Sequence, residues 1–241
     1  MIKIPRSIMP NFFTMGNMFC GFMAAVLALY VQNFTFAAWM IILASFFDAM
    51  DGKVARLANA SSKFGVEYDS LADNISFGLA PSALIYAIFY HNWGNAGLFI
   101  SFFPLLFVSI RLARFNVQLE GTEKSEFIGL PSPAAALTIA TYILFLSEYF
   151  PAEIFPKILT VITVSVSVLM VSTIRYDVMP AFTFRGGPLK AIYFIVVILM
   201  GLSAMAFPKT LLFPYILIYI VSGLGRFIFR LGQGKGLRKK K

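Results

Sequence analysis

Residues 48–81 of the chain read DAMDGKVARLANASSKFGVEYDSLADNISFGLAP, and the rest of the chain is organised around them. The stretch contains four of the protein's five aspartates: Asp48, Asp51, Asp69 and Asp73. The segments on either side are apolar enough to lie in a lipid bilayer. Ionisable groups are costly in such a place and are usually functional there, so these acids predict a site.

The spacing of the aspartates predicts two converging pairs. On a helix, Asp48 and Asp51 are three positions apart and Asp69 and Asp73 are four apart, so each pair projects from one face. Two such helices meeting through residues 57–63 would bring all four carboxylates to one point. Clustered carboxylates in a low dielectric take up protons or bind cations, and oxygen ligands suit Mg²⁺ or Mn²⁺. We therefore expect a site for two divalent ions.

The composition predicts a membrane protein. Of 241 residues, 59% are hydrophobic and 13% are charged, which is more apolar than a typical soluble domain. The predicted class is an all-α, polytopic membrane helix bundle, with one domain over residues 1–229 and a basic cytoplasmic tail over residues 230–241. Eight segments have about 20 apolar residues, the length that crosses a bilayer: 12–31, 34–58, 70–90, 96–118, 131–149, 156–174, 189–207 and 210–229.

The basic residues predict the orientation of these spans. With eight spans and a cytoplasmic N-terminus, all of the 20 lysines and arginines except Lys157 and Lys209 fall on the cytoplasmic side. Both termini and the acidic site would then face the cytoplasm. The net charge of +9 is scattered between apolar spans, which argues against nucleic-acid binding. The basic tail is expected to be attracted to anionic membrane lipid.

The acidic stretch resembles the signature of a known family of enzymes. At every fixed position and spacing it matches the CDP-alcohol phosphotransferase family: Asp48-x2-Asp51-Gly52-x2-Ala55-Arg56-x8-Gly65-x3-Asp69-x3-Asp73. Members of that family move a phosphatidyl group, or its ether-lipid equivalent, from a CDP-linked lipid to an alcohol and release CMP. The resemblance also implies a homodimer.

The resemblance implies a role for each fixed position. Asp48, Asp51 and Asp69 would hold one metal ion, and Asp73 would join the second ion or serve as the general base. The expected contacts to the CDP-lipid are Asn11, Thr14, Asn17, Gly52, Ala55, Arg56 and Gly65. For the three residues of the first span, hydrogen bonding to helix ends or neighbouring helices is an equally good explanation.

Further segments resemble the serine-using branch of the family, the phosphatidylserine synthases. They are DSLADNISFGLAP at 69–81, RLARFN at 111–116, FIGLPSPAA at 127–135 and MVSTIRY at 170–176. This resemblance implies CDP-diacylglycerol as the donor and L-serine as the acceptor, whose carboxylate needs a cation. The candidate serine contacts are Arg111, Arg114, Asn116 and Ser132. Arginines that reach lipid phosphate and a serine that starts a helix are the alternatives.

Other readings stay open at this point. Glycerol 3-phosphate or inositol would serve as acceptor in the same reaction type, and an ether lipid would serve as donor. A cation-coupled transporter is the rival class, because intramembrane aspartates also build ion pathways. A transporter predicts acids spread through the midplane in related repeats, whereas these four lie in one unrepeated block.

Overall fold

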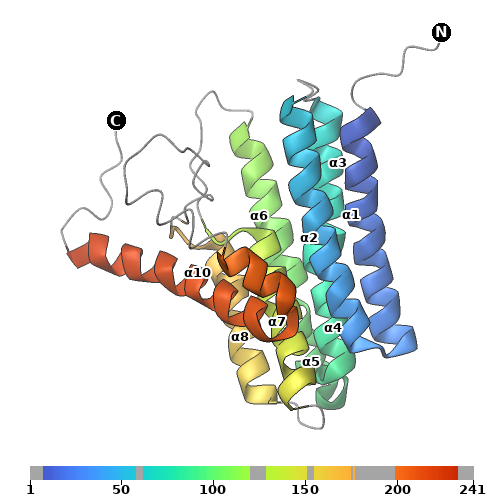
Figure 1. Ribbon diagram of the computed structural model, residues 1–241, viewed down its shortest axis with the longest axis vertical. Coiled ribbons are helices and arrows are strands. Elements are labelled where there is room, and N and C mark those ends of the chain that lie inside the picture. The colour runs from blue at the N-terminus through green and yellow to red at the C-terminus, as the bar shows by residue number, and fades with distance from the viewer. Residues whose placement is uncertain are drawn as a thin grey trace.

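The computed structural model of the chain describes residues 8–57, 62–119, 129–150, 155–174, 176 and 199–232. Every regular element in these ranges is a helix, so the predicted all-α class is confirmed. Figure 1 shows α1, α2, α3 and α6 running side by side, while α10 crosses the bundle at a large angle. The elements are α1 (Ile8–Val26), the π-helix η1 (Leu27–Val31), α2 (Phe34–Leu57), α3 (Lys63–Asp73), the π-helix η2 (Asn74–Leu79), α4 (Ala80–Ile88), the 3-10 helix η3 (Tyr90–Trp93), α5 (Gly94–Ser101), α6 (Phe103–Leu119), α7 (Ser132–Tyr149), α8 (Pro156–Val171) and α10 (Pro208–Gly232).

Within the described residues, five helical stretches are long and apolar enough to cross a membrane. They are Asn11–Val31, Phe34–Val54, Lys63–Ile88, Tyr90–Val117 and Pro208–Phe229, and Pro156–Val171 is a shorter apolar helix. The chain is therefore a multi-pass membrane protein, although the count of eight spans is not confirmed. Most of the predicted span 189–207 lies outside the described residues.

The third span begins earlier than the expected residue 70. Its first helix, α3, starts at Lys63, because Ser62 is a good N-cap: its Oγ accepts a hydrogen bond from the Gly65 N–H at 3.0 Å. Glu67 and Ser70 therefore lie on the same helix as Asp69 and Asp73. Because α3 starts at Lys63, it makes more than two full turns before Asp73 and lies alongside the acid-bearing end of α2.

A tight turn makes α1 and α2 antiparallel neighbours. Gln32 adopts a left-handed conformation with φ 58°, and the Asn33 Oδ1 caps α2 by accepting a hydrogen bond from the Phe36 N–H at 3.0 Å. Many buried positions of α1, η1 and α2 are small, which lets the backbones approach closely. These positions are Ala24, Ala25, Ala28, Ala37, Ala38 and Ala44.

The π-helix η2 follows directly after Asp73 and precedes Pro81. The sequence predicts a bend or an unpaired backbone here, because proline cannot donate a helical hydrogen bond. Instead the helix widens over Asn74–Leu79, and the Ala80 N–H reaches the carbonyl of Ile75. The widened segment is held against α1, where the Ser76 Oγ donates to the Asn17 carbonyl at 2.8 Å. The close approach of α1 and η2 depends on Gly21, since an added Cβ would lie 2.5 Å from the Ser76 Cα.

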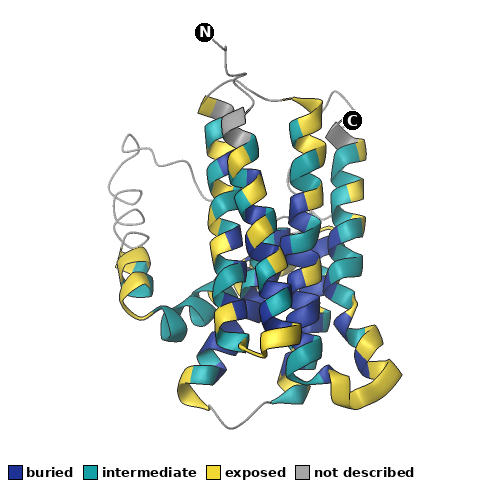
Figure 2. Cartoon of the chain, turned by 90° about the vertical axis from the view of Figure 1, so that its right-hand side faces the viewer, coloured by how far each residue is buried: buried dark blue, intermediate teal, exposed yellow. Residues whose placement is uncertain are grey.

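The burial pattern fits a bundle in lipid. Buried residues gather in the middle of the bundle, and exposed and intermediate residues cover its outer faces (Figure 2). Several of the exposed residues are large and apolar, as expected of helices that face hydrocarbon. They include Phe12, Phe19, Phe22, Phe46, Val161 and Val221.

We predict that Gly21→Ala destabilises the fold by about 1–3 kcal/mol, the usual cost of overpacking. Its Cβ would meet backbone at Ser76, which cannot move aside cheaply. The matched control is Gly201→Ala in another helical segment, where an added Cβ meets nothing within 4 Å. The measurement is the midpoint of thermal unfolding in detergent, expected to fall for Gly21→Ala only. Equal midpoints for Gly21→Ala and the wild type would contradict the close contact.

Candidate active site

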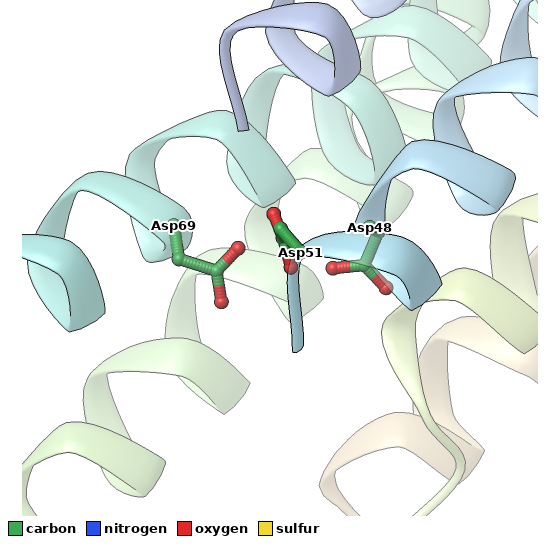
Figure 3. A group of neighbouring side chains, drawn as sticks. All are labelled: Asp48, Asp51 and Asp69. Atoms are coloured by element: carbon green, nitrogen blue, oxygen red, sulfur yellow. The ribbon is translucent and has the colours of Figure 1, made fainter. Parts of the chain in front are cut away.

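Three of the four aspartates converge where α2 meets α3. Asp48 and Asp51 project from α2 and Asp69 projects from α3, and Figure 3 shows their carboxylates turned toward one another. One ligand oxygen from each of the three lies within 4.8 Å of the others. Asp51 is buried, with 6% of its surface exposed, while the other two are half-buried. We call these three residues the acidic triad.

Asp73 lies beside the triad. It follows Asp69 by one turn on α3, is 8% exposed, and has its carboxyl group next to that of Asp48. The structure therefore brings Asp48, Asp51 and Asp69 into one group and sets Asp73 against one member of it. Four groups of like charge held this close repel one another, so the arrangement favours bound cations.

Helix α1 supplies neutral hydrogen-bond donors to two of the acids. The Thr14 Oγ1 donates to the Asp51 Oδ2 at 3.0 Å, and the Asn17 Nδ2 donates to the Asp73 Oδ1 at 3.2 Å. Both donors are buried, with exposures of 4% and 0%. The hydrogen bonds between helices that the sequence allows at these positions are thus present.

Among the other expected CDP-lipid residues, Gly52 and Gly65 lie within about one turn of a triad aspartate along α2 and α3. Gly52 is exposed, and an added Cβ would meet nothing within 4 Å, so the space beside Asp51 is open. Gly65 faces Asn11, whose Oδ1 would lie 3.9 Å from an added Cβ. Ala55 and Arg56 belong to α2, but their side chains lie outside the described part of the chain.

The donor set of the triad fits a hard divalent cation. All of its ligand atoms are carboxylate oxygens, which Mg²⁺ and Mn²⁺ prefer. The Asp69 Oδ1 is buried and has no hydrogen-bond partner among the described residues. An orphaned carboxylate oxygen is costly to bury, and coordination of a cation would remove that cost.

Two of the predicted serine contacts, Arg111 and Arg114, lie against the end of α8. The Nη1 atoms of Arg111 and Arg114 donate to the Met170 and Val171 carbonyls, each at 3.3 Å, and so cap the last turn of α8. Arg111 also lies close enough to interact electrostatically with Asp73. The two arginines therefore join the end of α8 to the neighbourhood of the acids.

Asn116 and Ser132 have different surroundings. The Asn116 Nδ2 donates to the Ser70 Oγ at 3.1 Å and to the Glu67 Oε2 at 3.3 Å, which ties α6 to α3 beside Asp69. Ser132 is a buried residue at the first position of α7. Ser70 and Glu67 are supporting residues that the sequence analysis missed, and their only sequence signal is that they lie three positions apart on the helix that carries Asp69 and Asp73.

Gly129 is a second element that the sequence analysis missed. Its φ is +89°, which favours glycine, and an added Cβ would collide with the Met170 carbonyl and lie 3.2 Å from the Arg111 Nη1. Its N–H donates to the Ile174 carbonyl at 2.8 Å, and the Leu130 N–H donates to the Leu169 carbonyl at 2.9 Å. Gly129 and Leu130, just before α7, therefore pack against the end of α8, and Gly129 lies beside Arg111.

Comparison with known proteins decides the family. Residues 7–169 match the family model described as CDP-alcohol phosphatidyltransferase. The chain belongs to the CDP-alcohol phosphatidyltransferase family. The resemblance stated from the acidic signature is thus confirmed. The family is divalent-metal dependent, and the acidic triad offers a cluster of carboxylates of the kind that binds such an ion.

Several curated relatives carry the name CDP-diacylglycerol–serine O-phosphatidyltransferase. The protein from Helicobacter pylori is 37% identical over 226 residues, which cover 93% of each chain. The protein from Methanocaldococcus jannaschii is 31% identical over 219 residues, covering 90% of this chain and 93% of the relative. The protein from Bacillus subtilis is 34% identical over 167 residues, covering 69% of this chain and 88% of the relative.

We predict that Asp51→Asn weakens Mn²⁺ binding more than about 10-fold, since the loss of an outer-shell partner alone costs about that much. Binding is measured without substrate, from the loss of the free Mn²⁺ signal in electron paramagnetic resonance of the purified protein. Glu148→Gln is the matched control, because Glu148 is an exposed acid whose partner is Lys209 at 3.0 Å. Unchanged Mn²⁺ affinity in Asp51→Asn would rule out the triad as the metal site.

Proposed function

We propose that the protein transfers the phosphatidyl group of CDP-diacylglycerol to the hydroxyl of L-serine and releases phosphatidylserine and CMP. The observation that carries this proposal is the acidic triad beside Asp73, in a chain 37% identical over 93% of its length to a relative named as a serine transferase. Membership of an enzyme family and the gathering of the acids at one place disfavour a transporter.

Two divalent ions, Mg²⁺ or Mn²⁺, are the proposed cofactors. Asp48, Asp51 and Asp69 would hold one ion, and Asp73 beside Asp48 would contribute to the second. When bound, such ions neutralise the diphosphate of the donor and stabilise the charge that develops during phosphoryl transfer.

Asp73 is the proposed general base. The serine oxygen forms a bond to the phosphorus that carries the diacylglycerol as the bond from that phosphorus to the CMP oxygen breaks. The hydroxyl proton passes to the Asp73 carboxylate, and the electron pair of the broken bond leaves with CMP. The burial of Asp73 keeps bulk water from its carboxylate, which favours transfer to serine over hydrolysis.

The substrates would reach the acids from two sides. The CDP-lipid would lie along the open side of α2 at Gly52, with Asn11, Ala55, Arg56 and Gly65 as its further contacts. Thr14 and Asn17 are buried and donate to Asp51 and Asp73, so we do not place them against the lipid. The serine carboxylate would meet Arg111, the described arginine that interacts with Asp73. The further candidates for serine are Arg114, Asn116 and Ser132.

The placement in the membrane is also a proposal. The triad end of the bundle and both termini would face the cytoplasm, from which water-soluble serine would reach the acids. The basic tail would meet anionic lipid. Residues 1–229 would act as one domain, and two copies would form a homodimer.

We expect CMP release from CDP-diacylglycerol by the purified protein to require L-serine. Glycerol 3-phosphate and inositol should not replace it, and an ether-linked donor tests the lipid specificity. A requirement for glycerol 3-phosphate or inositol would contradict the serine assignment.

Asp73→Asn should lower turnover by about 10²–10⁴-fold, the usual contribution of a general base, while CDP-diacylglycerol binding stays measurable. Turnover is followed as CMP released per enzyme, and Glu148→Gln again serves as the control. Near-normal turnover in Asp73→Asn would remove Asp73 from the role of base.

The orientation can be tested with single cysteines. Cys20, the chain's one cysteine, is buried, so a Cys20→Ser background is suitable for labelling. Leu57→Cys at the triad end of α2 should react with an impermeant maleimide only in inverted vesicles, and Asn95→Cys at the exposed start of α5 only in intact cells. The reverse pattern would place the site outside the cytoplasm.

A further inference from the structure

We propose that Thr14 and Asn17 are positioning residues, which fix the carboxylates of Asp51 and Asp73 from α1. This inference rests on the proposed function and adds a role beyond substrate contact. The two donors lie one turn apart on α1, and the two acids they reach belong to different helices, α2 and α3. Helix α1 therefore sets the orientation of a triad carboxylate and of the proposed base together.

The two donors are neutral, which matters for a cation site. A lysine or arginine at either position would neutralise an aspartate and compete with a bound cation. A hydroxyl or an amide N–H instead takes one oxygen of the carboxylate and leaves the negative charge in place. In metalloproteins, such outer partners orient the ligands and tune their affinity.

The burial of Asn17 supports a role directed at Asp73. Its side chain is fully buried, its Nδ2 donates to Asp73, and its Oδ1 has no hydrogen-bond partner among the described residues. An asparagine placed only for packing would be expected to satisfy both amide atoms. Burying the Asn17 Oδ1 without a partner costs free energy, and the hydrogen bond from Nδ2 to Asp73 offsets that cost.

The register of α1 against the acid-bearing helix is fixed on the same face. Ser76 lies three residues after Asp73, and its Oγ donates to the backbone carbonyl of Asn17 at 2.8 Å. One turn further along α1, Gly21 leaves no room for a Cβ against Ser76. With the backbone held at Asn17 and Gly21, the amide of Asn17 cannot slide along Asp73. On α2, Asp51 lies within hydrogen-bond distance of the Thr14 Oγ1, at 3.0 Å.

The test uses variants that change the hydrogen-bonding group and alter the size of each side chain little. Thr14→Val removes the donor, Thr14→Ser keeps the hydroxyl, and Asn17→Leu removes the amide. Thr138→Val is the control, since Thr138 is a buried hydroxyl on α7 that donates to its own helix at the Ala134 carbonyl. Mn²⁺ binding without substrate is measured for all variants, and kcat and KM for CDP-diacylglycerol are measured separately.

Thr14→Val should weaken Mn²⁺ binding about 10–100-fold, with Thr14→Ser close to the wild type and Thr138→Val unchanged. Asn17→Leu should lower kcat about 10–100-fold with KM for CDP-diacylglycerol unchanged, because Asp73 loses its orientation and the donor site does not. If Thr14→Val does not fold, Thr14→Ala is used instead. It leaves space where the hydroxyl and the methyl group of threonine were, and the same loss of Mn²⁺ affinity is expected.

Two results would overturn the inference while leaving the proposed function intact. One is wild-type Mn²⁺ affinity in Thr14→Val. The other is a raised KM with unchanged kcat in Asn17→Leu, which would make Asn17 a substrate contact only. A wild-type protein that binds no Mn²⁺ at all would instead refute the proposed metal site itself.

Discussion

The mutual repulsion of four carboxylates inside a membrane helix bundle is the constraint on which this structure depends. Asp51 and Asp73 are buried, and Asp48 and Asp69 are half-buried next to them. In a low dielectric, such a group destabilises the fold unless cations or protons compensate its charge. The bundle therefore has to hold the acids together against that repulsion. The hydrogen bonds from Thr14 and Asn17, and the packing of η2 against α1, serve that purpose.

The local arrangement around the acids follows from small residues and polar contacts. Gly21 allows α1 to approach η2, and alanines allow α1 to approach α2. Dispersion alone would give a bundle of loosely specified register, because lipid competes equally for apolar side chains. The Ser76 and Asn17 contact adds a directional bond at one defined height. This hydrogen bond fixes where the acid-bearing helix lies along α1, and so it also fixes the position of the acids along the bundle.

The acidic cluster is predictable from sequence, and its supports are not. Helical spacing alone places Asp48 with Asp51 and Asp69 with Asp73, and the short connection over residues 57–63 allows the two pairs to meet. The partners of Thr14 and Asn17 depend on which helices surround α1, which local periodicity does not contain. The same holds for Asn116, whose bond to Ser70 joins residues 46 positions apart. The third span begins at Lys63 and not at residue 70, because Ser62 caps the helix there even though the charges of Lys63 and Glu67 make its first turns polar.

The arginines show why residue type alone is an incomplete guide to a site. A guanidinium at the membrane edge suits a carboxylate or a phosphate, and it suits the unpaired carbonyls of a helix end equally well. In this chain α8 ends next to α6, so Arg111 and Arg114 each bind one of its last carbonyls. Another face of α6 carries Ser109 and Asn116, which hydrogen-bond to Asn74 and Ser70 next to the acids. A single helix thus fixes the arginine pair relative to the acid-bearing helix. Phosphoryl transfer requires the attacking oxygen to lie close to the phosphorus and in line with it. A nucleophile held at the arginines and a diphosphate held at the acids would therefore depend on α6 for their alignment.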